Sequence, residues 1–261
     1  DLVTDIRENQ PLIGVRKLHH MLRQSFADHH IKLGRDNLFN LLRRYDLLQK
    51  RRNKRVITTY SYHRFKKYKN ILPDLVVVRA ETLWVCDITY IRVNSGFCYL
   101  SLITDGYSRK IVGYNLGKTL STADCLIALK MAVASRQYLD RKLVHHSDRG
   151  IQYCSDDYVN TLTEHDIAIS MTQSGDPREN AIAERVNGIL KQEFLLNQTF
   201  VSYEQALAST HKAIDTYYYR RPHASCDYLT PSIAHRTEGE LRKRWKNYPY
   251  KKRIVEESDL N

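Results

Sequence analysis

Hydrophobic and polar positions divide the chain into stretches with different periodicities. Between residues 10 and 45, apolar residues recur at helical spacing, first over 15–22 and again after Leu33-Gly34, where Leu38, Leu41 and Leu42 share one side of a helix. Two short helices with a glycine-containing connection are typical of a helix-turn-helix, which can place its second helix in a DNA major groove. A simple helical hairpin would show the same periodicity, so both interpretations stay open.

From residue 83 the pattern changes to strands alternating with helices. Turn residues at 94–96 and 105–106 separate the first three strands. The expected elements are strands at 84–91, 97–104 and 110–116, a helix from 121 or 122 to about 137, a strand at 142–147, a helix around 156–165, a strand at 167–171 and a helix from 180. The order β-β-β-α-β-α-β-α describes an antiparallel meander extended by parallel strands, with helices on the faces. The predicted fold class is α/β, with an RNase H-like core behind an all-α N-terminal region.

The last of these helices has a clear apolar side. Asn180 is a suitable N-cap after a loop marked by Gly and Pro, and the apolar positions 182, 186, 189 and 190 recur at helical spacing. Glu184 and Lys191 are about two turns apart, so they project from the same face. Such a helix can also be an ordinary surface helix with solvated charges.

Composition narrows the class of protein. The 261 residues suffice for one well-packed domain and a smaller one, and a hydrophobic share of 42% with a mean hydropathy of −0.52 indicates a soluble globular chain. No apolar run approaches the roughly 18 residues of a membrane span, and no signal peptide is recognisable. A start at Asp1 rather than Met suggests a processed N-terminus. Five widely spaced cysteines without a C-x-x-C pair argue against a zinc module and favour a reducing compartment.

The net charge of +12 is unevenly distributed. Residues 1–80 hold 18 Lys and Arg against 7 Asp and Glu, residues 81–231 hold 15 against 17, and residues 232–261 hold 8 against 5. Residues 50–69 contain basic side chains interleaved with tyrosines and a phenylalanine and have no acidic residue. This composition suits a linker that contacts phosphates and bases, although a solvated flexible linker would look alike.

Three carboxylates stand out in this order of elements. Asp87 lies within the first strand, Asp148 follows the fourth, and Glu184 begins the last helix. A charge in a central strand is costly to bury without a partner, and divalent cations are such partners for carboxylates. Each acid alone has an ordinary structural explanation, but the three together favour a two-metal site for phosphoryl transfer. Asp105, in an Asp-Gly turn, is left out of the set.

The segments around these acids closely resemble the DDE transposases of the insertion sequence 3 family, which share the retroviral integrase catalytic core. The segments are WVCDITYI (84–91), HSDRGIQY (146–153) and ENAIAE (179–184), with 60 residues between the aspartates and 35 between the second aspartate and the glutamate. Lys191, seven residues after Glu184, also matches, as do the tripeptides at 221–223 and 229–231. The sequence departs from the family at Cys86, Glu179, Tyr218 and 226–227, and none of these removes a carboxylate.

The resemblance covers nearly the whole chain and implies a transposase of a bacterial insertion sequence, acting through metal-dependent 3′-end cleavage and strand transfer. It implies that Asp87, Asp148 and Glu184 are catalytic and hold two Mg²⁺ ions, with Mn²⁺ as a substitute. The expected DNA-contacting residues are Lys191, Arg149, Arg35, Arg43, Arg44, Arg51, Arg52, Lys54, Arg55, Lys66 and Lys67. His145 and His146 are expected to be structural.

The family pattern also implies an organisation and partners. The expected regions are a helix-turn-helix-like region at 1–49, a basic linker at 50–80, the catalytic core at 81–231 and a basic tail at 232–261. The implied partners are the terminal inverted repeats and target DNA, further copies of the chain on paired ends, and an upstream-frame product with a helix-turn-helix and leucine zipper. The implied location is bacterial cytoplasm, associated with the nucleoid and without a membrane.

Three alternatives stay open. A retroviral-type integrase would share the triad, but its zinc-binding His/Cys module is not matched. An RNase H-like nuclease would share the fold. A non-catalytic DNA-binding regulator derived from a transposase would retain end-specific binding, and that binding would survive Asp87→Ala.

Overall fold

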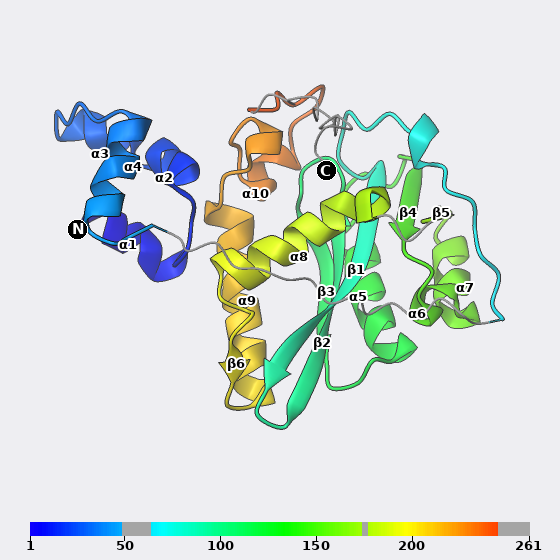
Figure 1. The fold of residues 1–261 in the computed structure, drawn as a ribbon. Helices are drawn as coiled ribbons and strands as arrows, with labels where there is room; N and C mark the ends of the chain where they lie inside the picture. The colour runs from blue at the N-terminus through cyan, green and yellow to red at the C-terminus, as the bar shows by residue number, and fades with distance from the viewer. Residues whose placement is uncertain (49–63, 174–176, 245–261) are drawn as a thin grey trace, which may run out of the picture.

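A computed structural model of the chain describes residues 1–48, 64–173 and 177–244. Short helices at the N-terminus form one group, and the remainder is built on a mixed sheet flanked by helices (Figure 1). The N-terminal helices are α1 (Leu2–Asn9), α2 (Val15–Met21), α3 (Arg23–Asp28) and α4 (Arg35–Arg44).

The sheet has the strand arrangement expected from the sequence. Its strands are β1 (Leu83–Val93), β2 (Gly96–Asp105), β3 (Ile111–Gly117), β4 (Leu143–Ser147) and β5 (Ile167–Met171), and their order is β3-β2-β1-β4-β5. The pairs β1–β2 and β2–β3 are antiparallel, whereas β1–β4 and β4–β5 are parallel. The two-residue β6 (Thr199–Phe200) pairs with the end of β1. The predicted meander extended by parallel strands is therefore confirmed.

Helices cover both faces of this sheet and enclose two hydrophobic cores. One core joins the sheet to α8 (Ala181–Glu193) and α9 (Tyr203–Arg220), and the other joins it to α5 (Thr122–Ala134), α6 (Ile151–Cys154) and α7 (Asp156–Glu164). Figure 1 shows α8 crossing β1 and β2. Helices α6 and α9 are not among the expected elements, although Ser202 is an N-cap of α9 whose hydroxyl accepts a hydrogen bond from Gln205 N.

The N-terminal group is all-helical, as expected, but its inner face is narrower than the sequence indicates. Leu38 and Leu42 of α4 are buried with residues of α2 and α3, whereas Leu41 is 38% exposed. The prediction that Leu41 shares the buried side is wrong. Leu38 and Leu42 are four residues apart and point in nearly the same direction, whereas Leu41 is three residues from Leu38 and lies at the edge of this narrow buried face. The group also contains α1 and α3, which the pattern does not predict.

The chain after α9 packs against the turn between β2 and β3. The short α10 (Pro231–Ala234) is followed by the buried His235, whose Nδ1 lies 3.0 Å from Ser108 Oγ. Asp105 is also buried, and its oxygens accept hydrogen bonds from the backbone N–H groups of Glu81, Tyr107 and Ser108. Asp105 is therefore a structural residue of the turn, as the sequence predicts.

Close packing of α5 on β3 depends on a glycine. A Cβ atom on Gly113 would lie 2.1 Å from the carbonyl oxygen of Ala128, so β3 and α5 would have to separate. We expect Gly113→Ala to lower the free energy of unfolding by about 1–3 kcal/mol, measured by urea denaturation. The matched control is Gly188→Ala within α8, where nothing lies within 4 Å of the added carbon. The control substitution is expected to raise the free energy of unfolding by as much as about 1 kcal/mol. Equal effects of the two substitutions would contradict the packing argument.

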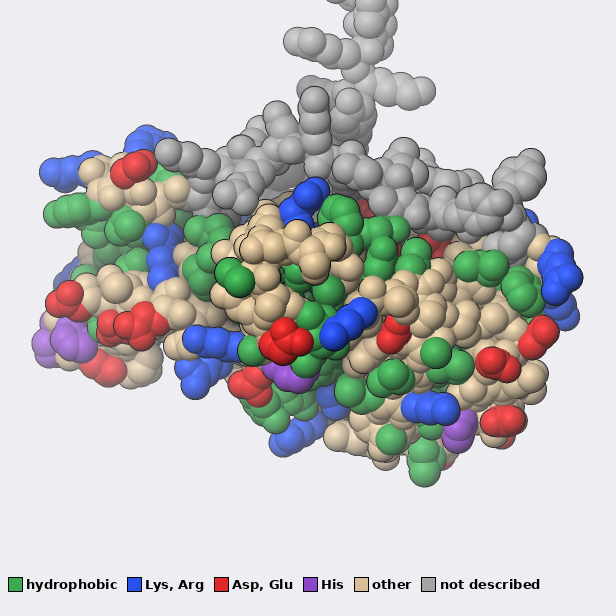
Figure 2. Space-filling view, turned by 90° about the horizontal axis from the view of Figure 1, so that it is seen from below, with side chains coloured by type: hydrophobic (Ala, Val, Ile, Leu, Met, Phe, Trp, Pro, Cys, Tyr) green, Lys and Arg blue, Asp and Glu red, His purple; other side chains and the backbone are tan. Residues whose placement is uncertain are grey.

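The charged side chains on the face shown in Figure 2 are mixed rather than gathered by sign. Lys and Arg side chains lie among Asp and Glu side chains over both the N-terminal helices and the core. Among the helices of the described ranges, none is both long and apolar enough to cross a membrane.

Candidate active site

Asp87 lies in the middle of β1, the central strand of the sheet. It pairs with Leu102 of β2 and is half-buried. Its Oδ1 accepts a hydrogen bond from Ile88 N at 2.9 Å, and its Oδ2 accepts one from Nδ2 of Asn187 at 2.7 Å. Both oxygens of this carboxylate are thus oriented by neighbours, one of which lies on α8.

Asp148 follows the last residue of β4. The parallel pairing of β1 with β4 runs from Leu83 opposite Val144 to Val85 opposite His146. Continuing this register by two positions brings Asp148 opposite Asp87. Oδ1 of Asp148 also accepts a hydrogen bond from the N–H of Gly150 at 2.9 Å. Strand register therefore brings together two acids that are far apart in the sequence.

Glu184 lies in the first turn of α8, and two asparagines fasten this helix to β1. Nδ2 of Asn180 donates a hydrogen bond of 2.8 Å to the carbonyl oxygen of Cys86, next to Asp87. Asn180 occupies the N-cap position, but its side chain does not cap the helix. The expected capping role is thus wrong, because the side chain binds the neighbouring strand. Asn187 fixes the next turn of the helix to Asp87 itself.

The electrostatics of Asp87 report the closeness of the other two acids. Burial raises the pKa of Asp87 to about 7, and the negative charge of Asp148 adds to this rise. Hydrogen bonds from Asn187 and Ile88 oppose the rise, and Glu184 makes a smaller contribution in favour of it. Asp87 therefore lies within range of both negative charges, and a nearby cation would relieve the repulsion.

The three carboxylates do not form a closed ligand cage. Within the described ranges, no group of three or more His, Cys, Asp or Glu side chains is placed to hold a metal ion. The assignment of Asp87, Asp148 and Glu184 as metal ligands stays a prediction.

Cations lie near the same end of the sheet. Burial lowers the pKa of Lys191, and the negative charge of Asp87 opposes this effect, which places the ammonium group near that carboxylate. Burial and the charge of Asp148 raise the pKa of Cys154 to about 11, and Lys67 and Arg149 oppose this rise. Lys191 therefore lies near Asp87, and Lys67 and Arg149 lie near Cys154. Their contact with DNA stays a prediction.

The other predicted DNA-contacting residues lie elsewhere. Arg35, Arg43 and Arg44 are exposed on α4; Arg35 forms an ion pair with Asp36, and the guanidinium of Arg43 lies over the ring of Phe39. The ammonium of the exposed Lys66 lies over the ring of Tyr68. The remaining predicted residues, which lie outside the described ranges, are Arg51, Arg52, Lys54 and Arg55.

Two histidines of β4 hold the strand in place. Nε2 of His145 lies 2.8 Å from Sγ of Cys86 and 3.0 Å from the hydroxyl of Tyr158, and Nδ1 of His146 lies 2.9 Å from Oγ of Ser170. Burial lowers the pKa of His145 to about 3 and that of His146 to about 4, so both are neutral at pH 7. These contacts agree with the structural role expected for both residues.

Sequence reasoning missed Asn187, although a signal for it was present. Asn187 lies three residues after Glu184 and four before Lys191, so all three share one face of α8. A buried asparagine on a helix face that also carries an acid and a lysine indicates a polar contact across the interface. Its partner could not be identified without the orientation of α8 on β1.

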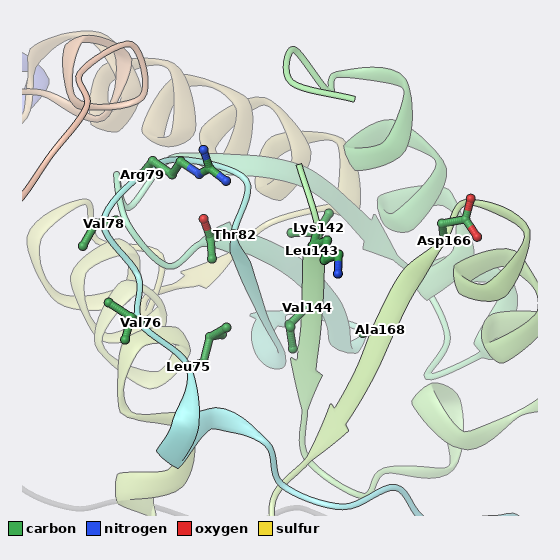
Figure 3. Close-up of a pocket in the computed structure, with 10 residues that line it drawn as sticks. All are labelled: Leu75, Val76, Val78, Arg79, Thr82, Lys142, Leu143, Val144, Asp166 and Ala168. Atoms are coloured by element: carbon green, nitrogen blue, oxygen red, sulfur yellow. The ribbon is translucent and has the colours of Figure 1, made fainter. Parts of the chain in front are cut away.

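A groove of about 710 Å³ lies away from these residues (Figure 3). It is lined largely by the apolar side chains of Leu75, Val76 and Val78 and by residues at the start of β4, whereas Asp148 follows the other end of that strand. The groove is therefore separate from the carboxylates.

The fold and two family matches identify an integrase core domain. Residues 78–177 and 165–231 each match a family described as "Integrase core domain". A chain of the simian T-cell lymphotropic virus intasome, solved by cryo-electron microscopy in complex with the PP2A regulatory subunit B56 gamma, superposes with a TM-score of 0.52 at 18% identity, covering 90% of this chain and 79% of that one. This likeness confirms the RNase H-like fold of retroviral integrases.

Relatives in sequence identify the family. The transposase for insertion sequence element IS629 from Shigella sonnei is 31% identical over 82% of this chain and 70% of its own length. Transposase InsF for insertion sequence IS3A from Escherichia coli is 33% identical over 73% of this chain and 66% of its own length. The chain belongs to the insertion sequence 3 family of transposases.

Proposed function

We propose that this chain is the catalytic subunit of its insertion sequence, which binds the element's ends and catalyses 3′-end cleavage and strand transfer at Asp87, Asp148 and Glu184. The observation that carries the proposal is the register of β1 and β4, which brings Asp148 opposite Asp87, together with the hydrogen bond from Asn187 that holds the helix of Glu184 against Asp87. A structural role alone would not require three acids at one end of a sheet.

The chemistry of these side chains fits divalent metal. Carboxylate oxygens are the ligands that Mg²⁺ and Mn²⁺ prefer, and a positive charge would lower the pKa of Asp87 and keep it ionised. Asp87, Asp148 and Glu184 would hold two such ions. When bound, the ions supply charge stabilisation for the attacking and leaving oxygens of an in-line phosphoryl displacement.

The reaction consists of two displacements at phosphorus. In the first, a water oxygen attacks the phosphodiester at the element's end, and the bond to the 3′ oxygen breaks. In the second, the oxygen of the freed 3′-hydroxyl attacks the phosphorus of a phosphodiester in the target DNA. The bridging 3′ oxygen of the target leaves and takes up the proton. Each step forms one P–O bond and breaks another, so no covalent protein–DNA intermediate is required.

The remaining residues of the site position the acids and the DNA. The hydrogen bond from Asn187 holds Oδ2 of Asp87, and the contact of Asn180 with Cys86 sets the position of Glu184 against β1. Lys191, near Asp87, supplies a cation for a terminal phosphate, and Arg149 supplies a second beside Asp148.

The expected macromolecular partners follow from the same function. They are double-stranded terminal repeats and target DNA, further copies of this chain on paired ends, and an upstream-frame product with a helix-turn-helix and leucine zipper. Joining two ends to one target takes two strand transfers, and a multimer would supply one active site for each end.

The test is a strand-transfer assay on a duplex carrying the element's own end, with Mg²⁺. Asp148→Asn and Glu184→Gln are expected to reduce joined product at least about a thousandfold, because losing a ligand forfeits several kcal/mol of charge stabilisation. Glu164→Gln, an exposed acid on α7, is the matched control and should join like wild type.

Each other outcome has a distinct meaning. Joining by the triad variants at the wild-type rate would show that the acids are misassigned. Wild type that only binds, even with its upstream-frame product, would be a regulator. Wild type that cuts without joining would be a nuclease.

A further inference from the structure

A basic cleft of about 570 Å³ lies between the N-terminal helices and the core. It is lined by side chains of α1, α2 and α4 on one side and by Arg185 of α8 on the other. Its charged lining consists of Arg7, Arg16, Lys17, Arg35, Arg185 and Asp36. Five cations therefore face a cleft that holds one acid.

A buried ion-pair network fixes the two walls of the cleft. Nζ of Lys17 lies 2.8 Å from Oε1 of Glu193, the last residue of α8, and Nε of Arg221 lies 2.8 Å from Oε2 of the same carboxylate. Leu12 N also donates a hydrogen bond to the carbonyl oxygen of Glu193. Because α8 carries both this contact and Arg185, the spacing between the walls is set by packed structure.

Several of these cations lack a carboxylate partner in the described part of the chain. Lys17 is paired with Glu193 and Arg35 with Asp36, but among the residues that the structure describes Arg7, Arg16 and Arg185 have no ion-pair partner. Nε of Arg7 is buried without a hydrogen-bond partner, and burial lowers the pKa of Arg7. Clustered cations with unused donors form a site for an anion.

We propose that this cleft binds backbone phosphates of DNA, with Arg16 and Arg185 contacting them from opposite walls. The proposal rests on the proposed function and extends it to a second contact surface. Guanidinium groups suit phosphate because they donate two parallel hydrogen bonds. Arg16 and Arg185 are both exposed, so a duplex backbone can reach them.

The position of Arg185 connects this cleft to the carboxylates. Consecutive helical residues point about 100° apart, so Glu184 and Arg185 face different sides of α8. DNA held in the cleft would lie beside the helix that carries the catalytic glutamate, and the N-terminal helices would align the duplex with the acids.

The first test measures how DNA affinity depends on salt. Full-length wild type, Arg16→Gln, Arg185→Gln and the double variant are titrated into a fluorescent duplex of mixed sequence between about 50 and 200 mM salt. Each lost phosphate contact should reduce the slope of log K against log salt by about 0.9, so the double variant should lose about 2. Lys130→Gln, an exposed cation on α5 at the opposite face of the sheet, should keep the wild-type slope.

A second measurement does not depend on affinity. The native cysteines are all buried, so a cysteine introduced on the surface can be modified selectively. Arg16→Cys and Arg185→Cys should each exchange with a mixed disulfide tethered to the phosphates of a duplex, which joins protein to DNA and releases the small thiol, and Lys130→Cys should not. Equal cross-linking at the three positions would overturn the proposal.

The outcomes separate this proposal from the proposed function. If wild type joins DNA and the double variant keeps the wild-type slope, the proposed phosphate contact in the cleft is overturned and the proposed strand-transfer activity is retained. If the double variant has a reduced slope and wild type fails to join DNA, the cleft is retained as a DNA-binding surface and the proposed strand-transfer activity is rejected. A wild type that neither binds nor joins DNA overturns both.

Discussion

Asp87→Asn is expected to abolish strand transfer and at the same time to stabilise the metal-free protein at pH 8. The carboxyl group has an ordinary pKa of 3.8, which burial and the charge of Asp148 raise to about 7 in the folded state. Above pH 7 the folded protein therefore carries a buried negative charge that the unfolded chain holds at lower cost. An amide of the same shape removes this charge and can accept the hydrogen bond from Asn187, but its NH₂ group cannot accept the second one from Ile88 N, which offsets part of the gain.

The sign and the pH window of this effect follow from linkage. A carboxyl group with a raised folded-state pKa makes the protein less stable as pH rises from the unfolded value of 3.8 through about 7. The full difference corresponds to about 4 kcal/mol, taking 1.36 kcal/mol per pKa unit as an order of magnitude. The melting temperature of the variant should exceed that of wild type by several degrees at pH 8, and the gap should be nearly closed by pH 4.

Metal gives a second readout for the same variant. Mg²⁺ should stabilise wild type at pH 8 and so raise its melting temperature. At a Mg²⁺ concentration a hundredfold above the dissociation constant, the free energy of unfolding should rise by about 2.7 kcal/mol. It should raise that of Asp87→Asn far less, because one ligand is lost. Asp140→Asn, an exposed acid, is the control and should leave both the pH dependence and the metal response unchanged. A variant that is no more stable than wild type at pH 8 would show that Asp87 is not under strain.

The meeting of the two aspartates could be predicted from the sequence because it depends on strand order. Asp87 within one strand and Asp148 at the end of a parallel neighbour must meet if the strands are adjacent, and the alternation of elements indicated that they are. The contact of Asn187 with Asp87 could not be predicted in the same way, because it depends on the rotation and tilt of α8 on the sheet. Tertiary packing, rather than local pattern, decides such contacts.

The same limit applies to the junction between the N-terminal helices and the core. Lys17 lies 176 residues before Glu193, and nothing in the sequence marks these two side chains as partners. In the structure their side chains are buried and share one network. Charge segregation predicted a basic N-terminal region, but the single carboxylate that fastens it to α8 became visible only in three dimensions.

Glu193→Ala is expected to destabilise the protein by about 3–5 kcal/mol, because removing one partner of a buried ion pair leaves the other charges unpaired. Arg221 has a side-chain exposure of 1%, so this cation cannot be hydrated without opening the structure, whereas Lys17, at 15%, is partly open to the cleft. The free energy of unfolding from urea denaturation gives the size of the loss. Glu164→Ala, an exposed acid, should cost less than about 0.5 kcal/mol.

The pH dependence and a second variant identify what Glu193 does. Burial alone would raise the pKa of Glu193, but the charge and hydrogen bonds of Arg221, followed by those of Lys17, outweigh burial and lower this pKa to about 2. Its stabilising contribution is therefore fully present above the ordinary value of 4.5 and is lost as pH falls toward about 2. Lys17→Met should leave the pair of Glu193 with Arg221 intact and release mainly the N-terminal helices, so limited proteolysis should cut that region first while the core unfolds near the wild-type midpoint. If Glu193→Ala instead matched Lys17→Met in both measurements, the carboxylate would serve the junction alone, and its bond to Arg221 would contribute nothing to the stability of the core.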